Sequence, residues 1–323
     1  MRFPRARTLL ENTKIEFINF DNVLHAAKKE RASKISGYVS IIYPNEVDLL
    51  FLRHGEPFNA GRITKTERKM VSIKEVVDRV KNAAVGMVSV HEAPEELVLL
   101  IIASISQSPL VGERSIAGMD LNTFMSQLLN DEFSGFMEIK RSPEVFYVLF
   151  DQGKAFKGYF ANKVGIEITN DQLLKFLQTS QNQETSITLF KDIPEVVEQA
   201  TPALLALYIK VFNNILSVFA SELSTNLVEK VTKTALNNTV KRHEFVKQFE
   251  IEGISIKEGE VVVTPEELSK GFAYLIDTLV AGFEVILGKE NTDRLILDAI
   301  RDYRFALKAS GFFEHSKLRR LGV

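Results

Sequence analysis

The chain has 323 residues, of which 45% are hydrophobic and 25% are charged, and its net charge is -2 at neutral pH. This length allows two or three domains with cores of their own, and the balanced charge gives no general attraction to nucleic acid or acidic membranes. The absence of cysteine excludes disulfides, thiolate metal sites and thiol nucleophiles, and it fits a reducing cytoplasm.

Residues 1–15 are basic at their start, and we expect them to form a loosely held leader. The apolar part of this segment, Thr8-Leu9-Leu10, is too short for the core of a signal peptide. The longest apolar run, Leu97 to Ile105, is about half of what a bilayer span requires. The sequence therefore predicts a cytoplasmic protein without a membrane span.

Residues 16–107 predict a first α+β repeat. A short helix begins at Phe20, and a strand follows at Ser36-Gly37-Tyr38. A second strand leads into the turn Arg53-His54-Gly55-Glu56, where Gly55 supplies the left-handed conformation that a tight hairpin needs. After the third strand of this antiparallel meander we expect a helix capped by Ser72, a strand at 86–90 and a helix that begins at Pro94.

The same pattern returns 98 positions later in residues 119–200, after a linker at 108–118 that contains proline and glycine. Ser134-Gly135 matches Ser36-Gly37, and Gln152-Gly153 matches His54-Gly55. A last helix is expected at Pro194-Glu195. A fixed period of this kind predicts two tandem repeats of helix, antiparallel meander, helix, strand and helix.

Residues 201–323 predict a mainly α-helical C-terminal domain. The apolar positions of 208–223 follow the spacing of one wide helical face, and those of 272–287 repeat it with an offset of 64. Each of these helices is followed by another apolar helical segment. Between the two pairs, alternating residues predict one β-hairpin at 251–263 with its turn at Glu258-Gly259.

The candidate site residues are few. His54 and its counterpart Gln152 stand in exposed turns and form a weak candidate site, although ordinary turn chemistry explains both. Backbone conformation explains the four repeated glycines better than phosphate binding does; they are Gly37, Gly55, Gly135 and Gly153. Among the five histidines, His91-Glu92 comes nearest to a ligand cluster, and we interpret it as a chance pair on the surface. We therefore predict no catalytic residue, no metal site and no cofactor.

The repeated unit resembles the PATAN-type domain. The resemblance is carried by Ser-Gly-aromatic-apolar-x-Ile, by the strand that ends in Gly55-Glu56 or Gly153-Lys154, and by Phe58-Asn59-Ala60 or Phe156-Lys157-Gly158. It covers residues 16–106 and 119–200, with Gly158 in place of the alanine that the family commonly keeps. The family occurs in bacterial signalling proteins, often beside response-regulator or small-GTPase-related modules, and is regarded as a non-catalytic interaction domain. The resemblance implies a regulatory or scaffolding role and supplies no catalytic residue.

The leading hypothesis is a non-enzymatic cytoplasmic interaction or adaptor protein, in bacterial signalling or the regulation of motility. Its partners would be other proteins, with a homodimer through the helical domain as a further expectation and no binding of nucleic acid. A small-ligand sensor, with a pocket between the repeats or under the helical domain, is the alternative. An enzyme of an unrecognised type is the third hypothesis.

Overall fold

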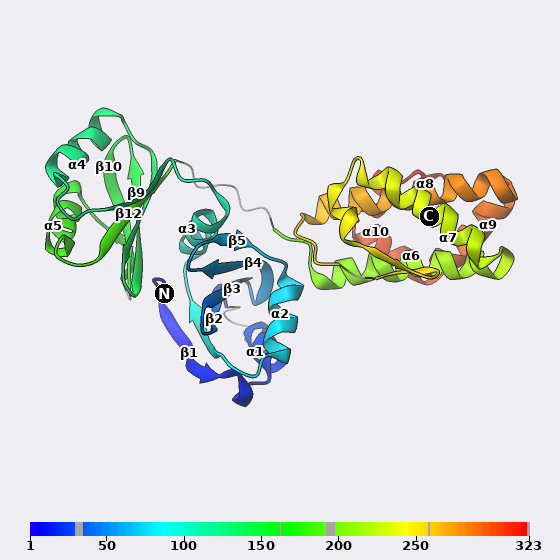
Figure 1. The fold of residues 1–323 in the computed structure, drawn as a ribbon, viewed down its shortest axis with the longest axis horizontal. Coiled ribbons are helices and arrows are strands. Elements are labelled where there is room, and N and C mark those ends of the chain that lie inside the picture. Colours follow the sequence, from blue (N-terminus) through cyan, green and yellow to red (C-terminus); the bar gives the residue numbers. More distant parts are fainter. Residues whose placement is uncertain (30–34, 162, 192–197, 258, 322–323) are drawn as a thin grey trace. The chain divides into compact units, whose positions relative to one another are not determined.

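The computed structural model describes residues 1–29, 35–161, 163–191, 198–257 and 259–321 (Figure 1). It confirms the predicted α+β class, since helices are combined with antiparallel sheets. The chain divides into two compact units. The first unit consists of Met1–Val71 and Glu75–Val196, and the second consists of Ser72–Lys74 and Val197–Val323.

The first unit begins with a six-stranded antiparallel sheet in the order β1-β6-β2-β3-β4-β5. Its strands are β1 (Arg7–Lys14), β2 (Gly37–Ile42), β3 (Glu46–Arg53), β4 (Glu56–Thr64), β5 (Arg68–Met70) and β6 (Met87–Glu92). The segments around them are the short 3-10 helix η1 (Ile15–Phe17) and the helices α1 (Phe20–Lys29), α2 (Ile73–Asn82) and α3 (Glu95–Ser106). Along the central strands, apolar residues either alternate with polar ones or form a continuous run, and these are the patterns that predict a strand.

A second six-stranded antiparallel sheet follows, in the order β7-β12-β8-β9-β10-β11. Its strands are β7 (Val111–Ser115), β8 (Gly135–Arg141), β9 (Glu144–Asp151), β10 (Lys154–Phe160), β11 (Lys163–Glu167) and β12 (Thr185–Phe190), and its helices are α4 (Leu121–Asn130) and α5 (Asn170–Ser180). In both sheets an edge strand comes first in the chain, and a four-stranded meander and a closing strand follow. The helix expected at Pro194-Glu195 lies outside the described residues.

The edge strands depart from the sequence predictions. Residues 7–14 are not a loosely held leader, because they pair with β6 as β1. The expected linker at 108–118 contains β7, which pairs with β12. Each expected three-stranded meander has a fourth strand, β5 or β11. These strands are largely exposed and polar, so backbone pairing forms them without the apolar alternation by which a strand is recognised.

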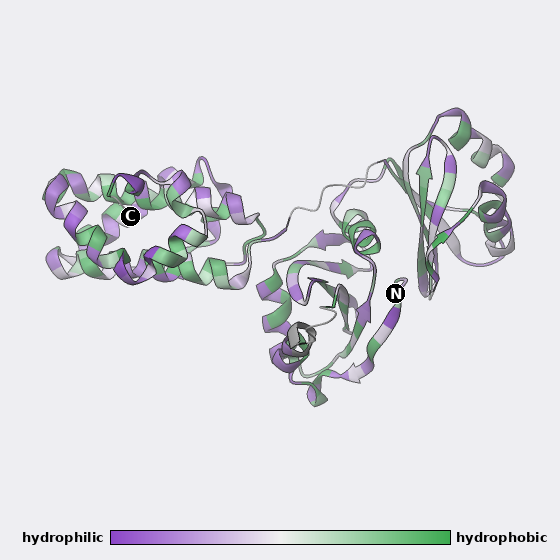
Figure 2. Cartoon of the chain, turned by 180° about the vertical axis from the view of Figure 1, so that it is seen from behind, coloured by the Kyte–Doolittle hydropathy of each residue, from purple (hydrophilic) through white to green (hydrophobic). Residues whose placement is uncertain are grey.

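Helix α3 packs against both sheets of the first unit. Its apolar residues share one core with Tyr38 and Phe51 of the first sheet and with Phe136 and Tyr147 of the second. Figure 2 shows the hydrophobic residues of α3 in green. A helix that is apolar on all sides must be buried, which explains the run from Leu97 to Ile105 without a membrane.

A buried ion pair also joins the two sheets. Both nitrogens of the Arg68 fork, on β5, donate to the carboxylate of Glu138 on β8, each at 2.8 Å. Tyr147 donates to the same carboxylate at 3.2 Å, and its hydroxyl oxygen lies 3.1 Å from that of Ser104 on α3. Bidentate pairing of this kind fixes geometry as well as adding energy.

The second unit is helical, as Figure 1 shows. Its helices are α6 (Pro202–Glu222), α7 (Thr225–Val240), α8 (Pro265–Leu287), α9 (Lys289–Ile300), α10 (Arg304–Ala309) and α11 (Phe312–His315), with 3-10 turns η2 (Glu244–Gln248), η3 (Arg301–Tyr303) and η4 (Lys317–Leu321). Helix α6 packs on α9, and α7 packs on α8. Tyr208 stacks on Phe272 at 5.2 Å between ring centroids, and Phe219 stacks on Phe283 at 4.0 Å. Both stacked pairs join positions that are 64 residues apart.

The hairpin of the second unit is placed differently from its prediction. Its strands β13 (Glu250–Glu252) and β14 (Ser255–Lys257) pair across Gly253, whose φ is +62°. The expected turn at Glu258-Gly259 was wrong, and Glu258 itself lies outside the described residues. The side chain of Asn213 on α6 holds β14 by two hydrogen bonds to the backbone of Ile256, at 2.8 and 3.1 Å.

Helix α6 is the one helix in the described ranges that is long and apolar enough to cross a membrane, judged by length and composition alone. Three of its aromatic residues, Tyr208, Phe212 and Phe219, are fully buried in the core of the second unit. Burial in this core accounts for their apolar character.

Candidate functional site

His54 and Gln152 occupy the same place in two hairpin turns. Both have left-handed φ angles, +50° and +47°, and both are followed by a left-handed glycine, Gly55 or Gly153. Two successive left-handed residues are the signature of the two-residue turn that matches the twist of a hairpin. Both side chains are exposed, and among the residues that the structure describes neither belongs to a cluster of functional groups.

The repeated Ser-Gly pair fixes these turns. The hydroxyl of Ser36 accepts the backbone N–H of His54 at 3.1 Å, and the hydroxyl of Ser134 accepts that of Gln152 at 3.0 Å. A Cβ on Gly37 would lie 2.1 Å from the carbonyl oxygen of His91 on β6. On Gly135 a Cβ would lie 2.2 Å from the carbonyl oxygen of Phe190 on β12. The motif therefore serves backbone packing.

A small polar pocket opens on one face of the first sheet, and we call it the sheet-face pocket. On β2 and β6, Ser40 lies directly opposite Ser89, and Tyr38 lies opposite His91. Opposite residues of an antiparallel pair present their side chains on the same face. His91 is only 8% exposed, so the expectation of a surface residue was wrong.

Strand β1 and the residues before it cover this polar face. Strand β1 bulges between Leu10 and Thr13, and Asn12 in the bulge has a φ of +44°. The backbone N–H of Asn12 donates to the hydroxyl of Ser89 at 2.9 Å. The hydroxyl of Tyr38 donates to the carbonyl oxygens of Phe3 and Pro4, each at 3.1 Å. Bulges often re-aim a strand beside a functional site.

A hydrogen-bonded chain leads from Arg5 to His91. Arg5 donates from Nε to the hydroxyl oxygen of Thr8 at 2.9 Å, and that oxygen lies 3.3 Å from Nδ1 of His91. The hydroxyl of Thr8 has one hydrogen and two lone pairs, so it can donate to Nδ1 or accept from it while it accepts from Arg5. Burial, and then the charge of Arg5, lower the pKa of His91 to about 4.

The groups of the sheet-face pocket are suited to binding rather than to proton transfer. His91 is neutral at pH 7, and its low pKa makes it a poor base. Burial raises the pKa of Tyr38 far above its ordinary value, so the phenol stays protonated. The pocket has a volume of about 40 Å³ and is also lined by Arg2, Arg5 and Glu11.

A second depression lies at one end of the first sheet, and we call it the end groove. It has a volume of about 430 Å³. Its lining is mainly apolar and comprises Ile15, Ile42, Tyr43, Pro44, Ala84, Val85, Gly86 and Met87, with Lys14 and Glu16. Val85 is 66% exposed, and Phe17, next to Glu16 in the chain, is 75% exposed.

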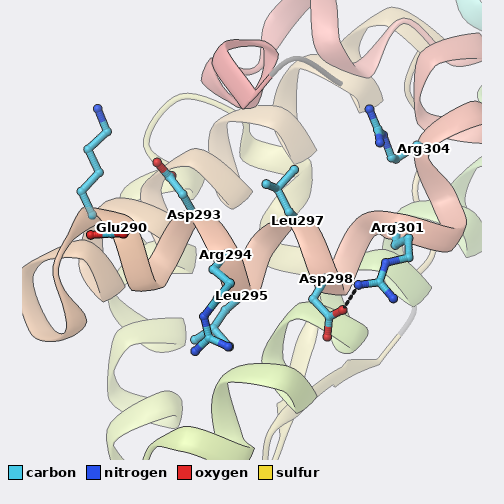
Figure 3. Close-up of a pocket in the computed structure, with 9 residues that line it drawn as sticks. Glu290, Asp293, Arg294, Leu295, Leu297, Asp298, Arg301 and Arg304 are labelled. Carbon is cyan, nitrogen blue, oxygen red and sulfur yellow. Dashed lines mark hydrogen bonds and ion pairs between the residues drawn. The ribbon is translucent and has the colours of Figure 1, made fainter.

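A wide depression of about 980 Å³ lies on α9 and the start of α10 in the second unit (Figure 3). Acidic and basic side chains alternate along α9 and pair locally. Asp298 pairs with Arg301 at 2.5 Å, and Asp293 pairs with Arg320 at 2.9 Å. These are exposed or partly exposed pairs of a solvated surface and do not converge on one point.

In the described part of the chain, no group of three or more His, Asp or Glu side chains is placed to hold a metal ion. Comparisons with protein-family models, curated proteins and solved structures find no match for this chain.

Two alternating stretches of the sequence mark the sheet-face pocket, although the predicted site residues do not include them. Val88-Ser89-Val90-His91 alternates apolar and polar residues, and Tyr38-Val39-Ser40-Ile41 does the same on the neighbouring strand. Alternation on two paired strands gathers polar groups on a single face. The pairing of these two stretches was the signal that could have pointed to the pocket.

Proposed function

We propose that this chain is a non-enzymatic adaptor that docks an apolar segment of another protein on its first unit. The end groove carries the proposal. Single exposed apolar side chains are ordinary on a protein surface, whereas an apolar depression beside several of them is typical of an interaction site. The exposed residues Val85 and Met87 line such a depression, and the exposed Phe17 follows its lining residue Glu16 in the chain.

The charges of the end groove favour an apolar partner segment. Lys14 and Glu16 pair with each other at 3.3 Å, so they leave little net charge to attract a charged segment. Burial, and then the charge of Asp48, raise the pKa of Tyr43 to about 12, so this lining residue is also uncharged. The groove therefore selects by shape and apolar contact.

The resemblance to PATAN-type domains supports a place in bacterial signalling or motility, in the cytoplasm. The shared strand order of the two sheets supports descent from one duplicated unit. A further support for binding over catalysis is the chemistry of the sheet-face pocket, where His91 and Tyr38 are both held uncharged.

The test is the set of proteins that co-purify with the tagged full-length chain from the cells in which it occurs. Changing both Val85 and Met87 to glutamate should abolish retention of at least one partner. Changing Leu110, an exposed apolar residue of the same unit outside the groove, to glutamate is the matched control and should leave retention unchanged. Identical partner sets for the double variant and the control would refute docking in the end groove.

A small-ligand sensor is the second candidate function, and the sheet-face pocket favours it. The pocket lies on one face of the first sheet rather than between the expected repeats or under the helical domain.

A further inference from the structure

The charges along the depression on α9 have a symmetric order around Leu297, which lies in the middle of its lining. Glu290 stands seven positions before Leu297, and Arg304 stands seven positions after it. Asp293 and Arg301 stand four positions before and after it. Reversing the direction of the chain about Leu297 therefore exchanges these acidic positions with basic ones.

These residues lie along one side of the helix. Their steps of three or four residues keep to a single helical face, and α9, η3 and α10 follow one another without a break. Figure 3 shows Glu290 toward one end of α9, Leu297 near its middle and Arg304 beyond its other end. All of them line the same depression.

Exposed apolar side chains adjoin both ends of this lining in the chain. Phe305, which follows Arg304, is 91% exposed. Val285 and Ile286, just before the start of α9 at Lys289, are 88% and 40% exposed. Phe305 and Val285 are the most exposed large hydrophobic side chains among the described residues. A partner that covers them removes apolar area from water.

A second copy of this chain supplies the matching surface. In a two-fold symmetric interface one patch must be complementary to itself, because residue i contacts residue j and j contacts i. When two α9 helices lie antiparallel with their Leu297 side chains in contact, Glu290 of each copy faces Arg304 of the other. Lys289 then faces Phe305, and a cation over an aromatic ring is attracted to it.

The other charges of the lining fit the same register. Asp293 faces Arg301 of the second copy, and Arg294 comes within two positions of Asp298. No two like charges of the lining stand directly opposite each other. This register joins opposite charges without any shift of one helix along the other, and charge complementarity of this kind fixes the register of an interface.

Ion pairs within the chain leave this arrangement open. Arg301 pairs with Asp298 at 2.5 Å, but these side chains are 72% and 56% exposed, and exposed pairs contribute little to stability. Asp293 pairs with Arg320 at 2.9 Å. The contact between Glu290 and Arg304 is therefore the better one to test.

We propose that this chain forms a two-fold symmetric dimer in which the outer face of α9 packs antiparallel on the same face of a second copy. The apolar contacts of Leu297 and Phe305 favour association, and the charges set its direction and register. The dimer does not depend on docking in the end groove. It would present two end grooves, so a partner with two matching segments would gain avidity.

The test is sedimentation of the full-length chain over a range of concentrations. The unmodified chain should reach twice its mass of 36.4 kDa. In a symmetric dimer each of the changes Glu290→Arg and Arg304→Glu places like charges opposite each other twice, so each variant alone should dimerise about tenfold more weakly or worse. An equimolar mixture of the two variants should dimerise again, because both contacts of the mixed pair then join opposite charges.

Three further variants are controls. Phe305→Ser should weaken the dimer without a change of charge. Lys230→Glu reverses a charge at an exposed position on α7, outside the depression, and should leave dimerisation unchanged. A chain with Val85→Glu and Met87→Glu should also dimerise normally, which separates this interface from the end groove. Circular dichroism verifies that each variant is folded.

The unmodified chain alone can overturn the proposal, by sedimenting as a monomer at every concentration. Two results with folded variants would do the same. One is a mixture of Glu290→Arg and Arg304→Glu chains that is no heavier than its components. The other is normal dimerisation of either variant alone, which would place the contact between copies elsewhere.

Discussion

Removal of the carboxylate of Asp48 should destabilise the first sheet strongly. Asp48, on β3, is fully buried. Its two oxygens accept from Nε and Nη2 of Arg62 at 2.6 and 3.0 Å, and Arg79 on α2 donates to it at 3.3 Å. The change Asp48→Ala leaves both guanidinium groups facing a buried gap.

The expected cost follows from the remaining partners of the two arginines. Removing one member of a buried pair typically costs about 3–5 kcal/mol. Arg62 keeps Glu75 at 2.5 Å, and Arg79 keeps Glu46, so we expect a value near the lower end, about 3 kcal/mol. Hydrogen exchange of the β2 and β3 amides in the full-length chain measures this free energy of opening. A loss below about 1 kcal/mol would refute the reasoning.

The second sheet offers a rescue for this loss. The residues 98 positions after Asp48 and Arg62, and 97 positions after Arg79, are all phenylalanines. These residues, Phe146, Phe160 and Phe176, form an aromatic cluster with ring centroids 5.1–5.6 Å apart. Gly158 makes room for it, since a Cβ there would lie 2.3 Å from the ring of Phe160. A buried ionic cluster can often be replaced by well-packed apolar residues without loss.

The rescue variant therefore changes Asp48, Arg62 and Arg79 to phenylalanine and Ala60 to glycine. It should recover most of the stability that Asp48→Ala loses, as measured by the same exchange experiment. A rescue variant less stable than Asp48→Ala would show that the two sheets do not place these positions equivalently, and it would count against the proposed duplication.

Three further predictions concern the first unit. His91 is protonated below about pH 6.5 in the unfolded chain but only near pH 4 in the folded chain, so unfolding takes up a proton between these pH values and stability falls as the pH drops. The change His91→Gln should flatten that part of a profile of stability against pH measured by urea unfolding. An unchanged slope would contradict the lowered pKa. The change Gly37→Ala should lower the free energy of unfolding by more than about 1 kcal/mol. The change Gly112→Ala, whose Cβ would meet nothing within 4 Å, should alter it by no more than about 0.5 kcal/mol. Equal melting temperatures for the two variants would contradict the close approach at Gly37. Glu138→Ala should cost about 3–5 kcal/mol by leaving Arg68 buried without its partner, and urea unfolding that shows under 1 kcal/mol would exclude a stabilising role for this pair.

The sequence was a good guide where local chemistry decides the structure. Apolar alternation marked the central strands, and helical spacing marked α6 and α8. The turns at Gly55 and Gly153 were predictable because few residues other than glycine adopt their conformation without strain. The fixed offset of 98 predicted two repeats that each contain an antiparallel meander, and the structure has two antiparallel sheets in this part of the chain.

Features built from distant segments were beyond the reach of these patterns. The Asp48 cluster draws Arg62 from β4 and Arg79 from α2, and nothing in local spacing brings them together. Edge strands such as β1 and β7 are held by backbone pairing and carry exposed side chains, so their periodicity is weak. The sheet-face pocket depends on the bulge at Asn12, and for that reason His91 was assigned to the surface.

The most direct test of docking in the end groove is site-specific photo-cross-linking in the cells that make the protein. A photoreactive amino acid at Val85 should give a discrete cross-linked band to another protein, and the same group at Leu110 should not. Extra unmodified chain should compete for the partner and weaken this band, whereas a chain with the changes Val85→Glu and Met87→Glu should not. Equal cross-linking at Val85 and Leu110, or none at Val85, would contradict the account.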